Sequence, residues 1–413
     1  MTIDRRAFLT GLAGASVLPL AACGTEAMES AGGEATASPP RSFEDRYDPW
    51  IVVSRSAIAH NVGVVSGLAD GRPIYAVIKN NGYGLGLVEA ASLLAEHEAI
   101  VGLAVVKPDD AITLRDAGIE RRVLLMGMAP DDGVAELVAS GIELSLYLDD
   151  DATRLPERAR AATSTAGIAA HVYVDTGMSR MGIPHHRAMP WLRGIAEVGS
   201  FSIVGAYTAF AEEAEFDREQ LRRLTGLVAE AEGEGIALGE LHAASSNGVY
   251  HLPEAHLDMV RPGMSLFGGY PSRPEEERTI AELQPAVSLQ ARVVRVEQLR
   301  AGDSVSYGRS YVTDRPTWIA TLPAGHVDGY PRRAVDGARI QIGNETYPVI
   351  GAVSASHIIV EVGDEPSVQV GDVATLMGDG APSVNPNEVS AASGASIYDL
   401  FMHLNPSLPR RIV

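Results

Sequence analysis

The chain of 413 residues is long enough for two domains, or for one barrel with a smaller unit. Its hydrophobic fraction of 46% and charged fraction of 21% are ordinary for a globular protein. The formal net charge of −20 argues against nucleic acid or an anionic membrane surface as a partner, because both would repel an acidic protein.

The first residues of the chain resemble an export signal. Arg5 and Arg6 precede a short apolar run at residues 11–20, as they do in twin-arginine signals. This run is too short to cross a bilayer as a helix. The pattern therefore predicts a signal peptide at residues 1–22 on a protein that is exported by the twin-arginine route.

A lipid anchor and a tether are predicted next. The sequence Leu-Ala-Ala-Cys, which ends at Cys23, is similar to a bacterial lipobox, in which the cysteine carries the lipid. Cys23 is the only cysteine of the chain, and no pattern around it would place it in a core. Residues 23–46 are rich in Gly, Ala, Ser, Thr, Glu and Pro without an apolar period, which is typical of a flexible tether. We therefore expect a folded body that contacts a membrane only through the lipid on Cys23.

Residues 47–280 alternate β-type apolar runs with helical patterns. The β-type runs lie at residues 74–78, 100–106, 122–126, 142–147, 168–174, 202–207, 240–244 and 257–260. Helical patterns lie between them, for example at residues 87–96, 107–117, 132–139 and 216–232. This alternation indicates βαβ units and a parallel sheet. Eight such units predict a closed (β/α)8 barrel of the TIM type, and an open doubly wound sheet is the alternative.

Residues 281–413 follow a different pattern. Short β-type segments are separated by Gly, Asp and Pro turns, and no long helical period appears. These segments lie at residues 287–298, 318–322, 340–342, 346–350 and 352–362. They predict a mostly antiparallel β domain, which follows a stretch rich in proline and charge at residues 270–276.

The most informative segment is Ala-Val-Ile-Lys-Asn-Asn-Gly-Tyr-Gly at residues 76–84. Lys79 ends a buried β-type run, so it is poorly hydrated and its pKa is expected to fall, which frees the amine to act as a nucleophile or base. The glycines beside it let backbone N–H groups approach a phosphate closely. The alternative interpretation is a lysine that extends from a strand end into solvent.

Further polar residues follow the other strands, at the edge where a parallel barrel carries its reactive groups. Arg180 follows the fifth run, Ser246 the seventh and Arg261 the eighth, and the β domain offers Tyr307 in a Ser-Tyr-Gly-Arg turn. Taken alone, each arginine could be an ion-pair residue and Tyr307 a half-buried loop tyrosine. His242 lies in an apolar run and is typical of a satisfied core histidine, so it is left out of the catalytic set.

In this order the segments resemble bacterial alanine racemase, a pyridoxal-phosphate enzyme built from a barrel and a β domain. The resemblance covers residues 50–413. It implies that Lys79 holds pyridoxal 5'-phosphate covalently and serves as one catalytic base, and that Tyr307 of the other subunit serves as the second. It therefore implies a homodimer with shared active sites and a small amino-acid substrate. Two bases on opposite faces suit racemisation, since a proton leaves one face of Cα and returns to the other.

The resemblance implies roles for further residues. Arg261 would face the pyridine nitrogen of the cofactor, and because a guanidinium keeps its proton, that nitrogen would stay unprotonated. Arg180 would help to hold the substrate carboxylate. The residues implied around the phosphate are Tyr83, Ser246, Gly263, Met264 and Tyr398.

The chain departs from the family pattern on the substrate side. Ala209 stands where the family usually has histidine, and Tyr173 stands where many members have lysine. His326 replaces a tyrosine, and Ala355 and Ser356 replace Met-Asp. Ala355 removes bulk beside the substrate, and hydrophobic pockets reject larger substrates only weakly. We therefore predict an exported racemase that acts on alanine and on larger amino acids.

Two alternatives stay open at the level of the sequence. One is another pyridoxal-phosphate reaction on the same barrel, such as decarboxylation or β-elimination, which the retention of Tyr307 and Arg261 disfavours. The other is a non-catalytic amino-acid-binding protein on the same scaffold, which Ala209 and Ser356 motivate.

Overall fold

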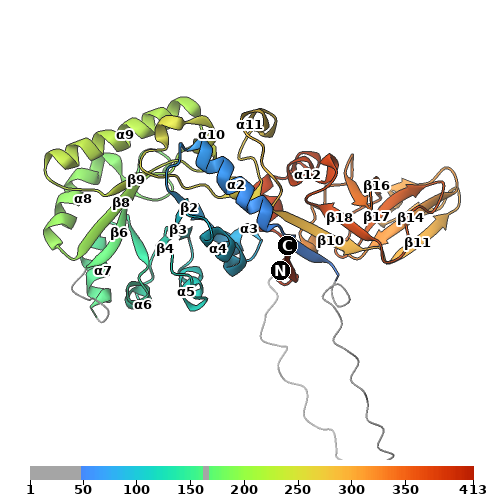
Figure 1. The fold of residues 1–413 in the computed structure, drawn as a ribbon, viewed down its shortest axis with the longest axis horizontal. Helices are drawn as coiled ribbons and strands as arrows, with labels where there is room; N and C mark the ends of the chain where they lie inside the picture. The colour runs from blue at the N-terminus through green and yellow to red at the C-terminus, as the bar shows by residue number, and fades with distance from the viewer. Residues whose placement is uncertain (1–47, 161–166) are drawn as a thin grey trace, which may run out of the picture. The chain divides into compact units, whose positions relative to one another are not determined.

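The computed structural model describes residues 48–160 and 167–413 (Figure 1). The predicted signal peptide at residues 1–22, the lipidation site Cys23 and the tether at residues 23–46 lie outside the described residues.

Parallel strands form the first sheet, whose order in the described part of the chain is β2–β3–β4–β5–β6–β8–β9 (Figure 1). The strands are β2 (Ile74–Val77), β3 (Ile100–Val105), β4 (Arg122–Leu125), β5 (Glu143–Leu146), β6 (Ile168–Asp175), β8 (Phe201–Tyr207) and β9 (Glu240–His242), and the short β7 (Ile183–Pro184) pairs with β6. Parallel bridges join His242 to Met259 and Ile74 to Val260. Met259 and Val260 thus complete the circle between the last strand and the first. The (β/α)8 barrel is confirmed, and the open sheet is excluded.

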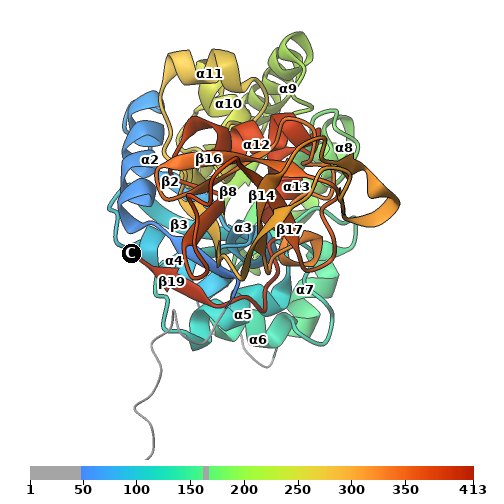
Figure 2. The ribbon, with the colours of Figure 1, turned by 90° about the vertical axis from the view of Figure 1, so that its right-hand side faces the viewer.

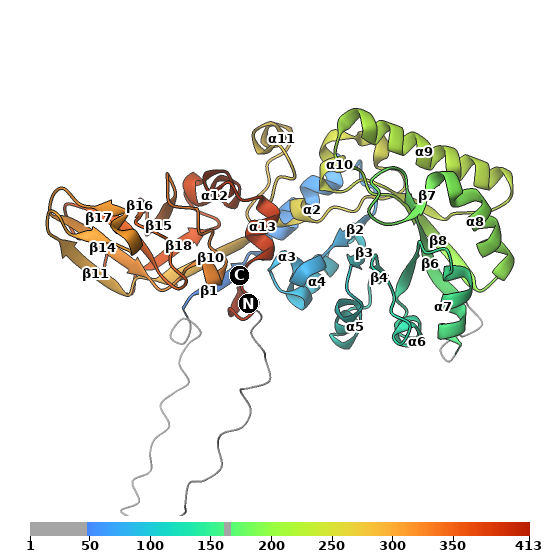
Figure 3. The same ribbon diagram turned by 180° about the vertical axis from the view of Figure 1, so that it is seen from behind.

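Helices follow the strands and pack outside them (Figure 3). They are α4 (Leu87–Ala95), α5 (Pro108–Asp116), α6 (Val134–Ala139), α7 (Asp151–Ala159), α8 (His185–Val198), α9 (Ala214–Gly233) and α10 (Ser246–His251). The strands β2 and β5 are buried along their whole length, because helices cover one face and barrel side chains the other. This explains why β2 appears in the sequence as a continuous apolar run, whereas β5 contains the polar residues Glu143 and Ser145.

The helix α2 (Arg55–Leu68) precedes the barrel strands and was not among the helical patterns that the sequence indicated. The Ser54 hydroxyl caps it by accepting a hydrogen bond from the Ala57 N–H at 3.2 Å. Asn61 on this helix is fully buried and donates to the Gln284 carbonyl at 2.8 Å. The helix therefore fastens the barrel to the segment that leads into the second sheet.

The second sheet is almost entirely antiparallel and has the order β11–β14–β17–β16–β15–β18–β10–β1–β19 in the described residues. This part of the chain faces the viewer in Figure 2. Its strands are β1 (Trp50–Val53), β10 (Val287–Arg292), β11 (Arg295–Leu299), β14 (Thr317–Leu322), β15 (Arg339–Ile342), β16 (Glu345–Ile350), β17 (Ile358–Gly363), β18 (Val373–Met377) and β19 (Arg410–Ile412). A smaller sheet pairs β12 (Ser304–Val305) with β13 (Tyr311–Val312). The helices α11 (Pro274–Ile280), α12 (Pro386–Ser393) and α13 (Ile397–Met402) complete this part. The predicted β domain is confirmed.

Local details differ from the sequence patterns. Residues 287–298 form two strands, because the chain leaves β10 after Arg292 and enters β11 at Arg295. Residues 352–357 do not continue into β17. Instead, the carbonyls of Ser354 and Ala355 accept hydrogen bonds from the N–H groups of His326 and Val327, at 3.0 and 3.1 Å. These bonds compete with strand pairing and hold the segment as a loop.

Candidate active site

Lys79 stands at the end of β2, where the backbone makes a left-handed turn. In α3 (Lys79–Tyr83), the residues Asn80, Asn81, Gly82 and Tyr83 all have φ between 53° and 60°. This conformation costs a non-glycine residue roughly 1–2 kcal/mol, and asparagine tolerates it better than most residues. Such a turn persists only where its surroundings hold it, and strained backbone of this kind gathers at functional sites. It brings the Lys79 Nζ atom to 6.0 Å from the centre of the Tyr83 ring.

Glycine is required in this turn at position 82. A Cβ at Gly82 would lie 2.8 Å from the Cβ of Ala90 on α4, in addition to the strain of φ +60°. We expect Gly82→Ala to destabilise the protein by about 2–4 kcal/mol and to weaken cofactor retention, because the turn that aims Lys79 must shift. Thermal denaturation and the visible absorbance of the bound cofactor measure the two effects. Gly118→Ala is the matched control, since Gly118 has φ +79° and a Cβ there would meet nothing within 4 Å. Equal effects of the two substitutions would contradict the steric argument.

The β domain supports the lysine turn from outside. The Arg410 guanidinium donates to the Gly84 carbonyl at 2.9 Å, and a Cβ at Gly84 would lie 2.1 Å from the carbonyl oxygen of Phe401 on α13. The Asn80 side-chain amide donates to the Met402 sulfur at 3.2 Å. The turn is therefore packed between the barrel and the helix that carries Tyr398.

Burial lowers the pKa of Lys79, and the nearby positive charge of Arg180 lowers it further, while Glu212 opposes the shift. Arg180 lies in the loop that follows β6. The Asp175 carboxylate shapes this loop by accepting hydrogen bonds from the N–H groups of Gly177 and Ser179, at 2.9 and 3.1 Å. The structure thus brings together Lys79, which the sequence assigned to cofactor binding, and Arg180, which it assigned to the substrate carboxylate. The lowered pKa favours the neutral amine of Lys79.

The residues assigned to the phosphate also meet. The Ser246 hydroxyl accepts hydrogen bonds from the N–H groups of Gly263 and Ser265, at 3.1 and 3.2 Å. Met264 begins the short helix η2 (Met264–Phe267) that follows Gly263. A Cβ at Gly263 would lie 2.3 Å from the Tyr83 hydroxyl oxygen, and the rings of Tyr83 and Tyr398 are 6.3 Å apart. Hydroxyl groups and close-packed backbone N–H groups of this kind suit a phosphate.

Arg261 is buried at the base of this site. Its guanidinium donates to the His242 Nδ1 atom at 2.8 Å and to the Thr208 carbonyl at 2.7 Å, and it lies 4.8 Å from the centre of the Tyr207 ring. Burial lowers the pKa of Arg261 to about 10, which still leaves it charged at neutral pH. The arginine is therefore a fixed donor at the place where the sequence predicted it.

His242 begins a chain of hydrogen bonds that the sequence pattern did not reveal. Its Nε2 atom is 2.8 Å from His171 Nδ1, and His171 Nε2 is 2.9 Å from a Glu143 carboxylate oxygen. Because Arg261 can only donate, His242 must accept at Nδ1 and carry its proton on Nε2. The same logic places the proton of His171 on Nε2, facing Glu143. Two neutral histidines thus connect Arg261 to Glu143 with one consistent set of donors and acceptors.

Electrostatics keeps this chain in one protonation state. Burial lowers the pKa of His242 well below its ordinary value, and the charge of Arg261 adds to the effect. Burial alone would raise the pKa of Glu143, but hydrogen bonds from His171, Arg122 and Tyr75 lower it to about 2. Glu143 is therefore ionised and His242 neutral at physiological pH. His242 is a satisfied core histidine, as expected, yet it also orients Arg261.

Tyrosines line the barrel beside Arg261. Tyr173 stacks on Tyr207 with ring centroids 4.4 Å apart, and the Tyr207 hydroxyl is 2.7 Å from the Ser145 hydroxyl. The Tyr147 ring lies edge-on to Tyr173 at 6.3 Å. Tyr173, which stands where many family members have lysine, therefore contributes an aromatic wall instead of a charge.

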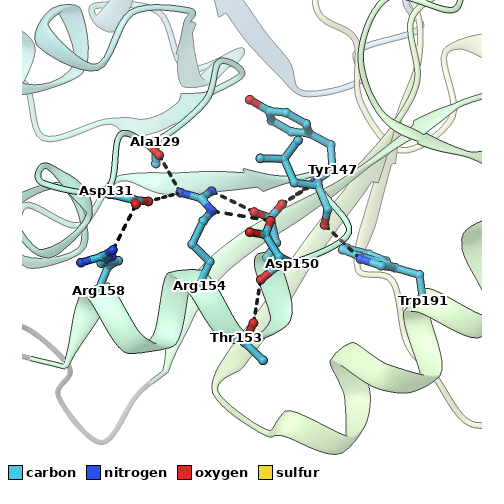
Figure 4. Close-up of polar contacts among 10 residues, drawn as sticks. Ala129, Asp131, Tyr147, Asp150, Thr153, Arg154, Arg158 and Trp191 are labelled. Carbon is cyan, nitrogen blue, oxygen red and sulfur yellow. Dashed lines mark hydrogen bonds and ion pairs between the residues drawn. The ribbon is translucent and has the colours of Figure 1, made fainter.

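A buried carboxylate fixes the loop that carries Tyr147. One Asp151 oxygen accepts hydrogen bonds from the N–H groups of Tyr147 and Leu148, both at 2.8 Å. The other accepts from Arg154 at 2.9 Å, and Arg154 also donates to the Ala129 carbonyl at 3.0 Å (Figure 4). These hydrogen bonds tie the loops that follow β4 and β5 to each other on this side of the barrel mouth.

Tyr307 lies in the β domain, in the short helix η3 (Tyr307–Arg309), and is 77% exposed. Among the described residues no hydrogen bond or ring contact joins it to Lys79. Its neighbour Ser306 donates to the Ala352 carbonyl at 3.1 Å, in the loop that leads to Ala355. The Ala355 carbonyl accepts a hydrogen bond from the segment of His326. Tyr307, His326 and Ala355 therefore belong to adjoining segments of the β domain. The structure thus separates the site into a barrel half and a β-domain half.

Two other kinds of feature are absent from the parts of the chain that the structure covers. Across residues 48–160 and 167–413, no group of His, Cys, Asp and Glu side chains could hold a metal ion. In the same ranges no helix has the length and apolar character needed to cross a membrane.

Comparison with known proteins identifies the family. The family model of the alanine racemase N-terminal domain matches residues 53–271, and that of the alanine racemase C-terminal domain matches residues 286–412. The chain is 34% identical over 367 residues to the alanine racemase of Carboxydothermus hydrogenoformans, over 87% of this chain and 98% of the relative. The chain belongs to the alanine racemase family. Within this family it is an alanine racemase-like isomerase.

Solved alanine racemase structures have the same fold. The enzyme of D-cycloserine-producing Streptomyces lavendulae matches with a TM-score of 0.81 and 28% identity, over 88% of this chain and 97% of that one. The enzyme of Bacillus anthracis with bound L-Ala-P matches with a TM-score of 0.79 and 26% identity, over 89% of this chain and 95% of that one. The barrel followed by a β domain is therefore the alanine racemase fold.

Alanine racemases use pyridoxal 5'-phosphate, and the residues of the barrel half fit this group. Gly263 lets the Tyr83 hydroxyl approach the backbone, since a Cβ there would lie 2.3 Å from that oxygen. Lys79 presents an amine with lowered pKa, and Arg261 is a buried donor for a ring nitrogen. The residues that would hold the phosphate are Tyr83, Ser246, Gly263, Met264 and Tyr398.

Proposed function

We propose that the protein is an amino-acid racemase that interconverts L- and D-amino acids by two-base proton transfer. The observation that carries the proposal is the Lys79 amine, whose pKa is lowered and which lies close to Arg180 within a barrel of the alanine racemase family. When bound, pyridoxal 5'-phosphate supplies the electron sink for the electrons of the Cα–H bond. The protein supplies the bases and the electrostatics.

Each half of the site has a role in this proposal. Lys79 moves the Cα proton on one face of the substrate, and Tyr307 of a second copy moves it on the opposite face. Arg180 binds the substrate carboxylate, as guanidinium groups do with two parallel hydrogen bonds. Arg261, held by His242, keeps a donor at the cofactor ring without giving up a proton.

A homodimer with shared sites is part of the proposal. The Tyr307 side chain is 77% exposed on the β domain. It can act as a base on a bound substrate only if another surface covers it. His326 and Ala355 lie on segments adjoining that of Tyr307 and are likewise exposed. A second copy whose barrel mouth covers this face would complete two equivalent sites.

We further propose a substrate range wider than alanine and a location outside the cytoplasm. The small side chains of Ala355 and Ala209 support the first point, because they leave room beside the reacting centre. The twin-arginine pattern and Cys23 support the second, with a lipid on Cys23 as the membrane anchor. D-amino acids would then form on the outer side of the cytoplasmic membrane.

Solvent deuterium exchange tests the reaction class. Incubated in D2O with a panel of amino acids that includes alanine and serine, the holoenzyme should place deuterium at Cα of both enantiomers. This follows because each base exchanges its proton with solvent between turnovers. Release of carbon dioxide or ammonia instead would indicate decarboxylation or β-elimination. Absence of both exchange and release would indicate a binding protein and overturn the proposal.

A further inference from the structure

A cavity of about 330 Å³ lies between the segment at residues 326–333 and the helices α12 and α13. Its volume is at the lower end of the roughly 300–1,000 Å³ that is usual for small-molecule pockets. The charged and aromatic residues that line it are His326, Tyr330, Arg332, Arg333, Asp399 and His403. The cavity therefore suits a small polar molecule.

Tyr330 contributes a buried hydroxyl that lacks a partner. Its side chain is 1% exposed, and the hydroxyl makes no hydrogen bond to any other group of the described residues. Burial raises the pKa of Tyr330, so the hydroxyl keeps its proton and remains a donor. A buried donor without an acceptor carries a free-energy cost, and such groups are rare in folded proteins. A ligand with an acceptor oxygen would remove this cost.

Two guanidinium groups line the same cavity. Neither Arg332 nor Arg333 forms an ion pair or a hydrogen bond with another residue in the part of the chain that the structure describes. By contrast, Arg339 on β15 donates to the Thr346 hydroxyl at 2.9 Å. Adjacent unpaired arginines are notable in a chain with a net charge of −20, where carboxylates are in excess. Guanidinium groups bind carboxylates with paired, charge-assisted hydrogen bonds, so this wall of the cavity favours a carboxylate.

Asp399 on α13 gives the cavity a negative group as well. The Asp399 carboxylate forms no ion pair with another described residue, although it shares the cavity with the two arginines. It would repel a phosphate or sulfate and attract an ammonium group. Leu400 is buried and Pro331 half-buried, and both supply apolar lining for a short side chain. The lining thus matches a molecule that carries a carboxylate and an ammonium group.

From this cavity we infer that the protein has a second, non-catalytic site, which binds a small amino acid as its zwitterion. Arg332 and Arg333 bind the carboxylate, and Asp399 binds the ammonium group. Tyr330 is the further donor for a carboxylate oxygen. The inference concerns binding alone and goes beyond the proposed racemase function.

The cavity is separate from the barrel half of the site. Lys79, Arg180 and Arg261 are not among its lining residues. Of the lining residues, only His326 belongs to the face that the proposed second copy covers. The helix α13 nevertheless links the two places, since it carries Tyr398, whose ring lies 6.3 Å from that of Tyr83. An amino acid in the cavity would therefore contact a helix that also borders the cofactor site.

The number of amino-acid molecules bound per chain tests the inference. Glycine is the probe, because it carries both charges and has no stereocentre for a racemase to invert. In equilibrium dialysis with radiolabelled glycine, the holoenzyme should bind about two molecules per chain at saturation, one in the cavity and one in the catalytic site. The double variant Arg332→Gln with Arg333→Gln should lose the cavity molecule, and Arg180→Ala should lose the other. Both arginines of the double variant are exposed and unpaired, so the fold should persist.

Arg295→Gln with Arg300→Gln is the matched control, since it removes two positive charges from exposed positions of the same domain outside the cavity. It should keep both glycine molecules, and an equal loss in this control would overturn the inference. One molecule per chain in the wild type that persists in the cavity double variant would also overturn it. One molecule that the cavity double variant loses would support the inference and count against the proposed function. Binding of no glycine would overturn both.

Competition distinguishes an amino-acid site from a site for any carboxylate. In Arg180→Ala, where the cavity is the remaining site, L-alanine should displace glycine at a concentration about tenfold or more below that of propionate, which lacks the ammonium group. Adding Asp399→Asn should abolish this difference by weakening alanine and leaving propionate within about twofold. Equal potency of alanine and propionate before that substitution would overturn the assignment to amino acids.

Discussion

Lys79→Ala and Tyr307→Phe are each expected to be almost inactive alone, and to recover about a quarter of wild-type activity when the two chains are co-expressed. Each substitution removes one base, which costs roughly 10²–10⁴-fold or more. Random pairing makes about half of the dimers mixed, and each mixed dimer has one site with the intact lysine and the intact tyrosine. The rate of racemisation by purified, co-expressed protein measures the recovery.

The control uses two lesions in the same half of the site. Co-expression of Lys79→Ala with Arg180→Ala leaves every barrel damaged, so no mixed dimer has an intact site and no recovery is expected. If Tyr307 acted on the Lys79 of its own chain, the Lys79→Ala and Tyr307→Phe mixture would also stay inactive. That result would refute shared sites. The exposure of Tyr307 at 77% makes the shared arrangement the natural expectation.

The barrel could be predicted from the sequence because its strands are short and buried on both faces. Each therefore forms an apolar run between helical patterns, and even the brief closing pair of Met259 and Val260 appeared in the expected place. The strand β1 could not be predicted in the same way. It precedes the barrel in the chain but pairs with β10 and β19 of the second sheet, and no local pattern encodes a partner so distant along the chain.

The barrel half of the site was likewise predictable, because Lys79, Arg180, Ser246 and Arg261 all follow strands whose ends meet at one face. The buried chain from His242 to Glu143 was not. His171 and Glu143 lie within strands, where a polar residue does not reveal which distant group it contacts. The available signal was a polar residue in a buried strand, His171 in β6 and Glu143 in β5.

Glu143→Gln is expected to destabilise the folded protein by about 3 kcal/mol at pH 7. Glu143 is 8% exposed, and its carboxylate accepts hydrogen bonds from Arg122, His171 and Tyr75. A glutamine would turn an N–H group toward these three donors, which leaves polar groups unpaired in the core. It would also leave the half-buried charge of Arg122 with Glu240 as its remaining partner in this cluster. The histidines that orient Arg261 would lose their common acceptor.

The same prediction has a defined dependence on pH. The pKa of Glu143 falls from its ordinary value of 4.5 to about 2 in the folded protein. A carboxylate with a lowered pKa stabilises the folded state above its unfolded pKa, and this stability is lost as pH falls through the folded value. The difference in stability between the wild type and Glu143→Gln should therefore be full at pH 7 and shrink between about pH 4.5 and pH 2. Urea denaturation of cofactor-free protein at several pH values measures it without interference from cofactor release.

Glu240→Gln distinguishes this effect from the loss of any ion pair with Arg122. Glu240 contacts the same guanidinium at 2.7 Å, but its side chain is 45% exposed. An exposed pair of this kind contributes about 0–1 kcal/mol, so the control should cost far less than Glu143→Gln and should not remove the pH dependence. Equal costs for the two variants would mean that Arg122 alone carries the stability. A larger cost for Glu143→Gln, together with a weaker visible absorbance of the bound cofactor, would show that the buried chain also supports Arg261 at the cofactor site.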